Sequence, residues 1–198
     1  MNFMKIGALS RTVIAGVAIY SAANSALADA SPQVKFATSA GDFVVEVYPD
    51  KAPKTVENFL QYVKDKHYDG TIFHRVIANF MVQGGGFDTK YVQKPTRAPV
   101  VHEGRQAMEK GLRNVPGSLA MARTNDPQSA TAQFFINVKE NGFLDPNTQS
   151  PGYTVFGKVV SGMDVVDKIK LTPTGAGGPF GSDVPKTPVL INSATLVK

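Results

Sequence analysis

The chain of 198 residues contains no cysteine and no tryptophan. The absence of cysteine excludes a disulfide framework, a thiol nucleophile, a Cys-x-x-Cys redox site and a lipid-anchored N-terminal cysteine. Stability must therefore come from the hydrophobic core, which a chain of this length is able to build.

Several catalytic and ligand-binding motifs are also missing. The histidines His67, His74 and His102 lack the spacing of metal ligands, so no metal site and no cofactor are predicted. No Gly-x-Ser-x-Gly motif indicates a serine hydrolase. Gly84-Gly85-Gly86 is not followed by the Lys-Ser/Thr pair of a phosphate loop, and we interpret it as a turn. Gly175–Gly178 is interpreted as a loop.

Other polar residues receive ordinary interpretations. His74 is interpreted as a partly buried histidine with satisfied hydrogen bonds, and Glu103 and Glu109 as solvated charges. No block of five like charges occurs, and the formal net charge is only +5. Solvated basic residues are favoured over a nucleic-acid-binding surface, so no nucleic-acid partner is predicted.

The N-terminus carries the features of an export signal in the expected order. Lys5 and Arg11 precede an apolar run from Thr12 to Tyr20, and Ala26-Leu27-Ala28 supplies the small residues of a cleavage site. We predict a signal peptide over 1–28 that is cleaved, with cleavage after Ala30 and an uncleaved N-terminal hydrophobic helix as alternatives.

Cleavage after Ala28 leaves one domain over 29–198, which has 198 − 28 = 170 residues and a net charge of +3. The apolar run is shorter than the roughly 20 residues of a membrane span, so no stable membrane insertion is expected after cleavage. The periplasm is the predicted location, and full secretion is the alternative.

Short β-rich runs separated by turn signals dominate the mature chain. About eight strands in one domain predict a closed barrel or a sandwich. The expected strands are Val34–Thr38, Asp42–Tyr48, Ile72–Val76, Phe80–Gln83, Gly117–Ala122, Gln133–Val138, Thr154–Val160 and Val189–Val197.

Two helices are expected between these strands. After Pro53, the residues Val56, Phe59, Leu60 and Val63 form one apolar stripe with helical spacing. A second helix, over 162–170, places apolar residues on one side before a proline ends it. Both stripes are expected to pack on the barrel ends.

The segment Phe73–Phe87 mixes large apolar residues with two side chains that donate hydrogen bonds. Arg75 and Gln83 offer donors but no base that titrates near neutral pH. Such a site binds and polarises a ligand without breaking a covalent bond. The alternative for Arg75 is an ordinary surface or ion-paired arginine.

A second segment repeats this mixture. In a strand, Gln133, Phe135 and Asn137 share one face. A buried glutamine satisfied by the backbone beside a core phenylalanine is the structural alternative.

These segments, taken in order, resemble the signature blocks of the cyclophilins, a family of peptidyl-prolyl cis–trans isomerases. The resemblance covers most of residues 34–197, and with the export signal it is strongest to the periplasmic members of Gram-negative bacteria. The blocks are Phe73–Ile77, Phe80–Gly85, Gly117–Ala122, Ser129–Asn137, Phe143–Asp145 and Val155–Val159.

The resemblance implies an eight-stranded antiparallel closed barrel, mainly β, capped by two α-helices. It also implies a catalytic role for Arg75. The implied substrate-binding residues fall into four groups: Phe80, Met81, Phe135 and Leu144 form the proline pocket; Gln83 and Gln133 hold the substrate backbone and brace the arginine; Ala122, Arg123 and Thr124 form an adjacent groove; Phe143 and Tyr153 occupy further pocket positions.

The chain departs from the family pattern at three of these positions. Arg123 stands where asparagine is common, and Tyr153 aligns near the position of a histidine. Phe143 replaces a common tryptophan, and the loss of its indole donor predicts weak binding of cyclosporin.

The predicted function is rotation about X–Pro bonds of unfolded or exposed polypeptides, assisting the folding of exported proteins. We expect a monomer. The alternative is a proline-peptide binding module or chaperone without turnover.

Overall fold

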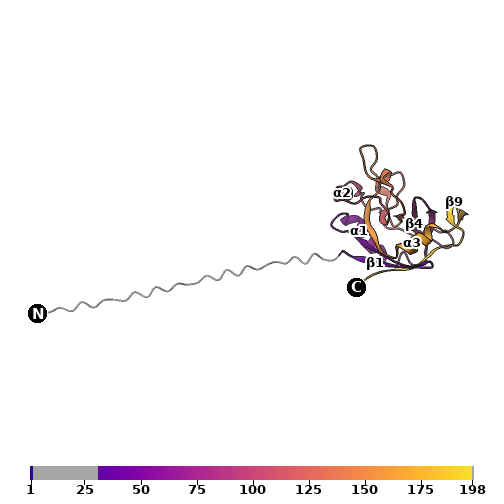
Figure 1. Cartoon of the computed structure of the whole chain (residues 1–198), viewed down its shortest axis with the longest axis horizontal. Helices are drawn as coiled ribbons and strands as arrows, with labels where there is room; N and C mark the ends of the chain where they lie inside the picture. Colours follow the sequence, from indigo (N-terminus) through magenta and orange to yellow (C-terminus); the bar gives the residue numbers. More distant parts are fainter. Residues whose placement is uncertain (2–30, 198) are drawn as a thin grey trace.

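The computed structural model describes Met1 and residues 31–197. Within this range eight strands form the predicted closed antiparallel barrel (Figure 1). The signal peptide expected over 1–28 and both cleavage positions lie outside the described residues. In spatial order the barrel strands are β1 (Gln33–Thr38), β10 (Leu190–Leu196), β3 (Thr71–Ile77), β4 (Met81–Asp88), β6 (Phe134–Asn137), β5 (Ser118–Met121), β7 (Val155–Ser161) and β2 (Gly41–Val47).

The two expected helices are confirmed. Helix α1 (Pro53–Lys64) begins with a proline, whose missing N–H costs nothing in a first turn, and it buries Val56, Phe59 and Val63 in the core. Helix α3 (Met163–Lys170) buries Val165, Val166 and Ile169 in the same core. No helix in residues 31–197 combines the length and the apolar character needed to cross a membrane.

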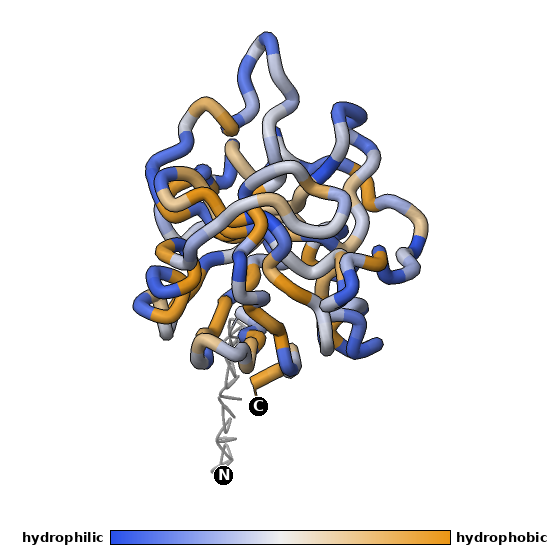
Figure 2. Tube along the Cα trace, turned by 90° about the vertical axis from the view of Figure 1, so that its right-hand side faces the viewer, coloured by the Kyte–Doolittle hydropathy of each residue, from blue (hydrophilic) through white to orange (hydrophobic). Residues whose placement is uncertain are grey.

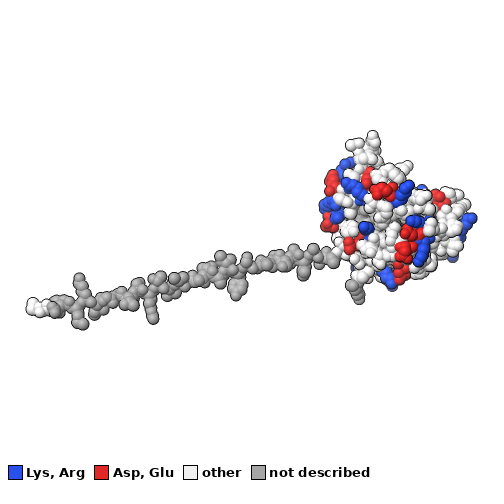
Figure 3. All heavy atoms as spheres, viewed as in Figure 1, with Lys and Arg blue, Asp and Glu red and all other residues white. Residues whose placement is uncertain are grey.

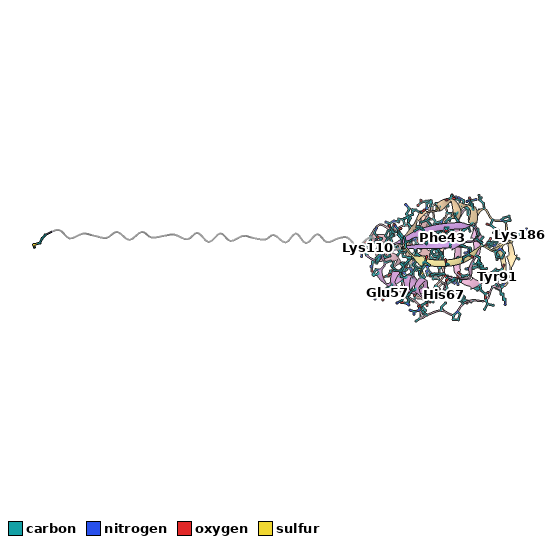
Figure 4. All side chains as sticks on the ribbon, turned by 90° about the horizontal axis from the view of Figure 1, so that it is seen from below. Phe43, Glu57, His67, Tyr91, Lys110 and Lys186 are labelled. Atoms are coloured by element: carbon teal, nitrogen blue, oxygen red, sulfur yellow. The ribbon has the colours of Figure 1, made fainter. Side chains whose placement is uncertain are left out.

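Aromatic rings fill the barrel interior. Phe36 stacks on Phe43, with ring centroids 5.0 Å apart, and Phe134 meets the ring of Tyr68 edge-on at 5.5 Å. Figure 4 shows Phe43 within the barrel, where only 1% of its surface is exposed. Apolar segments lie mostly in the body of the molecule, whereas the loop at the top of Figure 2 is hydrophilic to neutral. Burial of this cluster is the main stabilisation that a chain without disulfides requires.

The glycine triplet is not the turn that its sequence suggests. Gly84, Gly85 and Gly86 lie inside β4, which continues to Asp88. A Cβ atom on Gly85 would lie 2.9 Å from the Tyr68 ring, and Gly85 has a φ of +82°. The triplet is therefore a place where core rings approach a strand closely, which glycine alone permits without strain.

The segment around Gly175–Gly178 is also different from the expected loop. Strands β8 (Thr174–Gly177) and β9 (Phe180–Pro185) pair as a hairpin outside the barrel, and β9 packs against β3. The ring of Tyr91 lies on the hairpin turn, where a Cβ atom on Gly178 would come within 2.3 Å of it. Glycine has a low strand propensity, but here its missing side chain lets the Tyr91 ring pack directly on the hairpin (Tyr91 is labelled in Figure 4).

A third helix, α2 (Gly104–Glu109), was not expected, and it corrects the interpretation of Glu103. Glu103 precedes this helix and is buried, with 7% of its surface exposed. Its carboxylate accepts hydrogen bonds from the backbone N–H groups of Lys54 and Thr55 at 3.1 and 2.8 Å. Glu103 thus caps the N-terminus of α1, whose own cap residue, Ala52, has no polar side chain.

Charges of both signs are distributed over the visible surface. Basic and acidic side chains lie beside one another on the face shown in Figure 3. Ion pairs such as Lys35–Asp42, at 2.7 Å, are about half exposed and are therefore worth little to stability.

Candidate active site

A cavity of about 650 Å³ lies on the outer face of the barrel, beside β3, β4 and β6. The strand alternation explains its position. Phe134 and Ile136 point into the core, so Phe135 between them faces outward; Val82 is likewise a core residue between Met81 and Gln83. The lining residues are His74, Arg75, Phe80, Met81, Gln83, Phe87, Ala122, Arg123, Gln133, Phe135, Leu144, Tyr153 and Pro179–Asp183.

The floor of the cavity is a separate apolar cluster. Met81, Ala120, Phe135 and Val155 are buried in it. Phe80, Ala122, Leu144 and Tyr153 pack against this cluster and are partly exposed. The arrangement gives a slot with apolar walls, which suits the ring of a proline side chain.

Two of the predicted binding residues do not line the cavity. Phe143 is 69% exposed and stacks on the ring of Phe80, with centroids 5.7 Å apart, but it is not among the lining residues. Thr124 lies beyond the rim, where its hydroxyl hydrogen-bonds to that of Ser129 at 2.8 Å. The structure brings the other nine predicted binding residues and Arg75 to one cavity, and their roles in binding stay predictions.

Arg75 faces the cavity from β3 but is not braced as the resemblance implied. Gln83 pairs with Arg75 across β3 and β4, yet its side-chain amide donates to Gln133 Oε1 at 3.1 Å. The polar contact of Arg75 is an ion pair from Nε to Asp183 Oδ2 at 3.9 Å. Among the described residues, no side-chain hydrogen bond joins Arg75 to either glutamine. The guanidinium therefore keeps free donors for a ligand.

The position of Gln133 depends on Gly86. A Cβ atom at residue 86 would lie 2.5 Å from Gln133 Cδ, so any larger residue displaces that side chain. The glycine in β4 thus makes room for a polar group of the site.

We expect Gly86→Ala to lower kcat/KM about three- to tenfold, because the bond between the two glutamines is worth that factor when lost. Stability should change little, since the displaced atoms end a flexible side chain. Gly142→Ala is the matched control, because a Cβ atom there meets nothing within 4 Å. Equal kinetics in both variants, measured with a proline-containing peptide, would contradict the assigned position of Gln133.

Arg123 supports the wall that contains Tyr153. Its Nε and Nη2 atoms donate to the Gly152 carbonyl at 3.1 and 2.8 Å, and its guanidinium lies 4.5 Å from the Tyr153 ring centroid. His102 Nε2 lies 3.2 Å from the same carbonyl. His102 Nδ1 accepts from the Gly104 N–H at 3.3 Å, so Nε2 carries the proton and donates. The guanidinium of Arg123 therefore uses its hydrogen bonds within the protein.

A buried amide network supports Phe80 and Leu144, and the sequence did not reveal it. Asn137 Nδ2 donates to Asn114 Oδ1 at 3.1 Å. Asn141 Nδ2 donates to Asn137 Oδ1 at 2.7 Å and to the Phe80 carbonyl at 2.8 Å. This network anchors the short 3-10 helix Gly142–Leu144, which places Leu144 on the slot. The only related signal in the sequence was that Gln133 and Asn137 share one face of a strand.

His74 is buried, and its hydrogen bonds are not satisfied as expected. Only 4% of its surface is exposed, and within the described part of the chain its Nδ1 has no hydrogen-bond partner. Its ring contacts Phe87 and Phe180, with centroids at 4.7 and 5.5 Å. Burial and, secondarily, the charge of Arg75 lower the pKa of His74 from 6.5 to about 4. The imidazole is therefore neutral at neutral pH.

This pKa predicts an acid-sensitive contribution to stability. Between pH 6.5 and 4 the unfolded chain protonates His74 while the folded chain does not, so the free energy of unfolding falls as the pH falls. The expected loss is about 3 kcal/mol at 1.36 kcal/mol per pKa unit. Between pH 7 and pH 4, urea denaturation should show about 3 kcal/mol more loss in the wild type than in His74→Phe, because the other titrating groups, His67 and His102 among them, are common to both proteins. Parallel pH dependences of the two proteins would refute the assignment.

The described residues do not form a metal-binding site. Among residues 31–197, no three histidine, aspartate or glutamate side chains gather as metal ligands would. The cavity instead presents apolar walls, amide groups, the guanidinium groups of Arg75 and Arg123 and the carboxylate of Asp183.

Comparisons with known proteins identify the family of the chain. The family model of the cyclophilin type peptidyl-prolyl cis-trans isomerases matches residues 33–196. The chain is a cyclophilin. A Streptomyces antibioticus peptidyl-prolyl cis-trans isomerase is 55% identical over 167 residues, covering 83% of this chain and 98% of the relative. Escherichia coli peptidyl-prolyl cis-trans isomerase B is 52% identical over 166 residues, covering 82% and 98%.

The fold of this cyclophilin also matches solved structures. A Cryptosporidium parvum cyclophilin type isomerase superimposes with a TM-score of 0.66 at 22% sequence identity, covering 85% of this chain and 98% of that one. A second crystal structure of that protein, in the presence of the dipeptide Ala-Pro, gives a TM-score of 0.64 at 23% identity, covering 84% and 99%. The barrel predicted from the sequence is thus a cyclophilin barrel.

Proposed function

We propose that this cyclophilin accelerates rotation about X–Pro bonds in exported polypeptides, and that Arg75 is its catalytic residue. The observation that carries the proposal is the placement of one half-exposed guanidinium beside an apolar slot. The membership of the chain in an isomerase family and its curated relatives named as isomerases support the reaction class.

The chemistry needs only binding and polarisation. Amide resonance gives the X–Pro bond a rotation barrier of about 18–20 kcal/mol. In the twisted transition state that resonance is broken and the proline nitrogen regains a lone pair. A guanidinium that donates to this nitrogen stabilises the twisted form more than the planar form, and only such differential binding accelerates the step.

The remaining cavity residues fit supporting roles. Phe80, Met81, Phe135 and Leu144 would hold the proline ring while the preceding residue turns. The bond between Gln83 and Gln133 leaves the NH2 group of Gln133 as a donor and Oε1 of Gln83 as an acceptor for the backbone of the substrate. The Cryptosporidium structure with the dipeptide Ala-Pro is consistent with a short proline-containing ligand for this fold.

A protease-coupled assay on chromogenic Ala-Pro peptides tests the activity. We expect the chain over 29–198 to accelerate the slow cis-to-trans phase in proportion to enzyme concentration. Binding of the peptides without acceleration would instead identify a non-catalytic proline-peptide holder and overturn the proposal.

The export role rests on residues 1–28 and is tested separately. We propose cleavage after Ala28 and a periplasmic, monomeric enzyme. Fractionation of cells that express the full chain, with N-terminal sequencing of the product, should find a mature protein in the periplasm that begins at Asp29. An uncleaved protein in the cytosol would overturn this part alone.

Cyclosporin is proposed to bind weakly. Phe143, which stands at the position of the usual tryptophan, has no indole donor and lies outside the cavity.

A further inference from the structure

The cavity has a wall that the proline slot does not require. The turn and the first four residues of strand β9 add Pro179, Phe180, Gly181, Ser182 and Asp183 to the lining. This wall belongs to the hairpin outside the barrel, at the edge of the molecule away from α1 and α2 in Figure 1. It stands beside Arg75, because Asp183 pairs with that residue.

Asp183 is a weakly satisfied acid. Among the described residues that line the cavity it is the only one with a carboxylate. Its side chain is 36% exposed, and its ion pair to Arg75 Nε, at 3.9 Å, is longer than a hydrogen bond. No hydrogen-bond donor within residues 31–197 reaches the carboxylate. The backbone of Asp183 has a φ of +64°, a conformation that aspartate and asparagine tolerate better than most residues.

Two aromatic side chains, Phe87 and Phe180, line the same cavity as this carboxylate. Phe180, three residues before it, contacts Phe87 edge-on at 5.2 Å, and Tyr91 lies 6.4 Å away. The neighbouring His74 is neutral at neutral pH, so it adds no positive charge to the wall. A carboxylate beside aromatic rings matches a lysine or arginine side chain, whose aliphatic stem packs on the rings while its head meets the acid.

Two cations, Arg75 and Arg123, line the cavity as well, so the attraction acts on a cation that comes closer to Asp183 than to either arginine. Arg123 is bound to the Gly152 carbonyl and to the Tyr153 ring, on another wall. Arg75 opposes an incoming cation, but its ion pair with Asp183 is partly exposed and screened by solvent. When its guanidinium donates to a proline nitrogen, it shares its donors with the substrate and the Asp183 carboxylate remains available.

We propose that Asp183 makes this enzyme prefer substrates with a lysine or arginine close to the isomerised proline. The preference rests on the proposed function, since it concerns the rate at which X–Pro bonds turn over. It assigns the β8–β9 hairpin to substrate selection and the barrel to catalysis.

The test is a peptide series with lysine, alanine or glutamate at each of two positions on either side of one X–Pro bond. Isomerisation is followed by exchange spectroscopy, because a protease would add its own charge preference. We expect kcat/KM of the wild type to be about two- to fivefold higher for lysine than for glutamate at one position or more, at low ionic strength. The ratio should shrink toward one in 1 M salt, where charges are screened.

Two variants test the role of Asp183 through the ratio of kcat/KM for the lysine peptide to kcat/KM for the glutamate peptide. This ratio is measured within each protein, so it does not depend on the overall activity of that protein. Asp183→Asn keeps the shape and tolerates the positive φ, and it should bring the ratio to about one. Asp183→Lys should invert it. Glu57→Lys is the matched control, because Glu57 is exposed on α1 and lies at the other end of the molecule from Tyr91 in Figure 4; it should keep the wild-type ratio.

The outcomes separate the two proposals. A wild type that turns over no peptide overturns the proposed function. A wild type that is active on all peptides, with a ratio of one at every position, overturns only the role of Asp183. A lysine preference that persists in Asp183→Asn, or that Glu57→Lys also abolishes, likewise overturns it.

Discussion

Replacement of Arg75 by alanine is expected to lower kcat/KM by about 10²–10³-fold, the usual effect of removing one donor aimed at a transition state. The fold should stay intact, because the side chain is 46% exposed and its single ion pair is long. The loss of unfolding free energy should stay below about 1 kcal/mol. Peptide isomerisation kinetics and a urea denaturation curve measure the two effects on the same preparation.

Arg75→Lys is the control for charge alone. Lysine keeps the positive charge but loses the planar fork of donors, so this variant should recover part of the lost activity. A larger KM with an unchanged kcat in Arg75→Ala would show that the guanidinium only binds substrate. Turnover near that of the wild type would remove Arg75 from the mechanism.

Replacement of Glu103 by alanine is expected to lower the free energy of unfolding by about 2–4 kcal/mol. The change leaves three donors around a buried carboxylate without their acceptor: the N–H groups of Lys54 and Thr55 and the Thr55 hydroxyl, which donates at 2.7 Å. Thr55 is 1% exposed, so water reaches it poorly. The midpoint of urea denaturation should fall with an unchanged slope.

Glu109→Ala provides the matched control. Glu109 is an exposed glutamate of α2, near Glu103 in sequence, and its replacement should change stability by less than about 0.5 kcal/mol. Similar effects of the two substitutions would mean that the cap on α1 contributes little.

Local patterns in the sequence predicted the strands and two of the helices, and the family resemblance supplied the closed barrel and the residues of the site. Strand alternation set the outward faces of Met81, Gln83 and Phe135, and the helical spacing of apolar residues located α1 and α3. The family resemblance then joined segments that are distant along the chain. Family membership and fold are confirmed, whereas the roles of Arg75 and its neighbours stay predictions.

The failures share a physical cause, which is that contacts between distant residues overrode local signals. The glycines of β4 resemble a turn until Tyr68 is seen against Gly85, and the glycines of the β8–β9 hairpin resemble a loop until Tyr91 is seen on Gly178. Glu103 resembles a solvated charge until α1 is placed beside it. No sequence motif pointed to Asp183, because its importance depends on its ion pair with Arg75, which is distant along the chain.

The closure of the barrel has a consequence for association with other polypeptide chains. Each of its eight strands, within the residues described, is hydrogen-bonded on both sides. Extended polypeptides can pair with the exposed edge strand of an open β-sheet and so add a strand to it. A closed barrel has no edge strand to which such a chain could pair. The barrel itself therefore cannot be extended by strand addition from another chain.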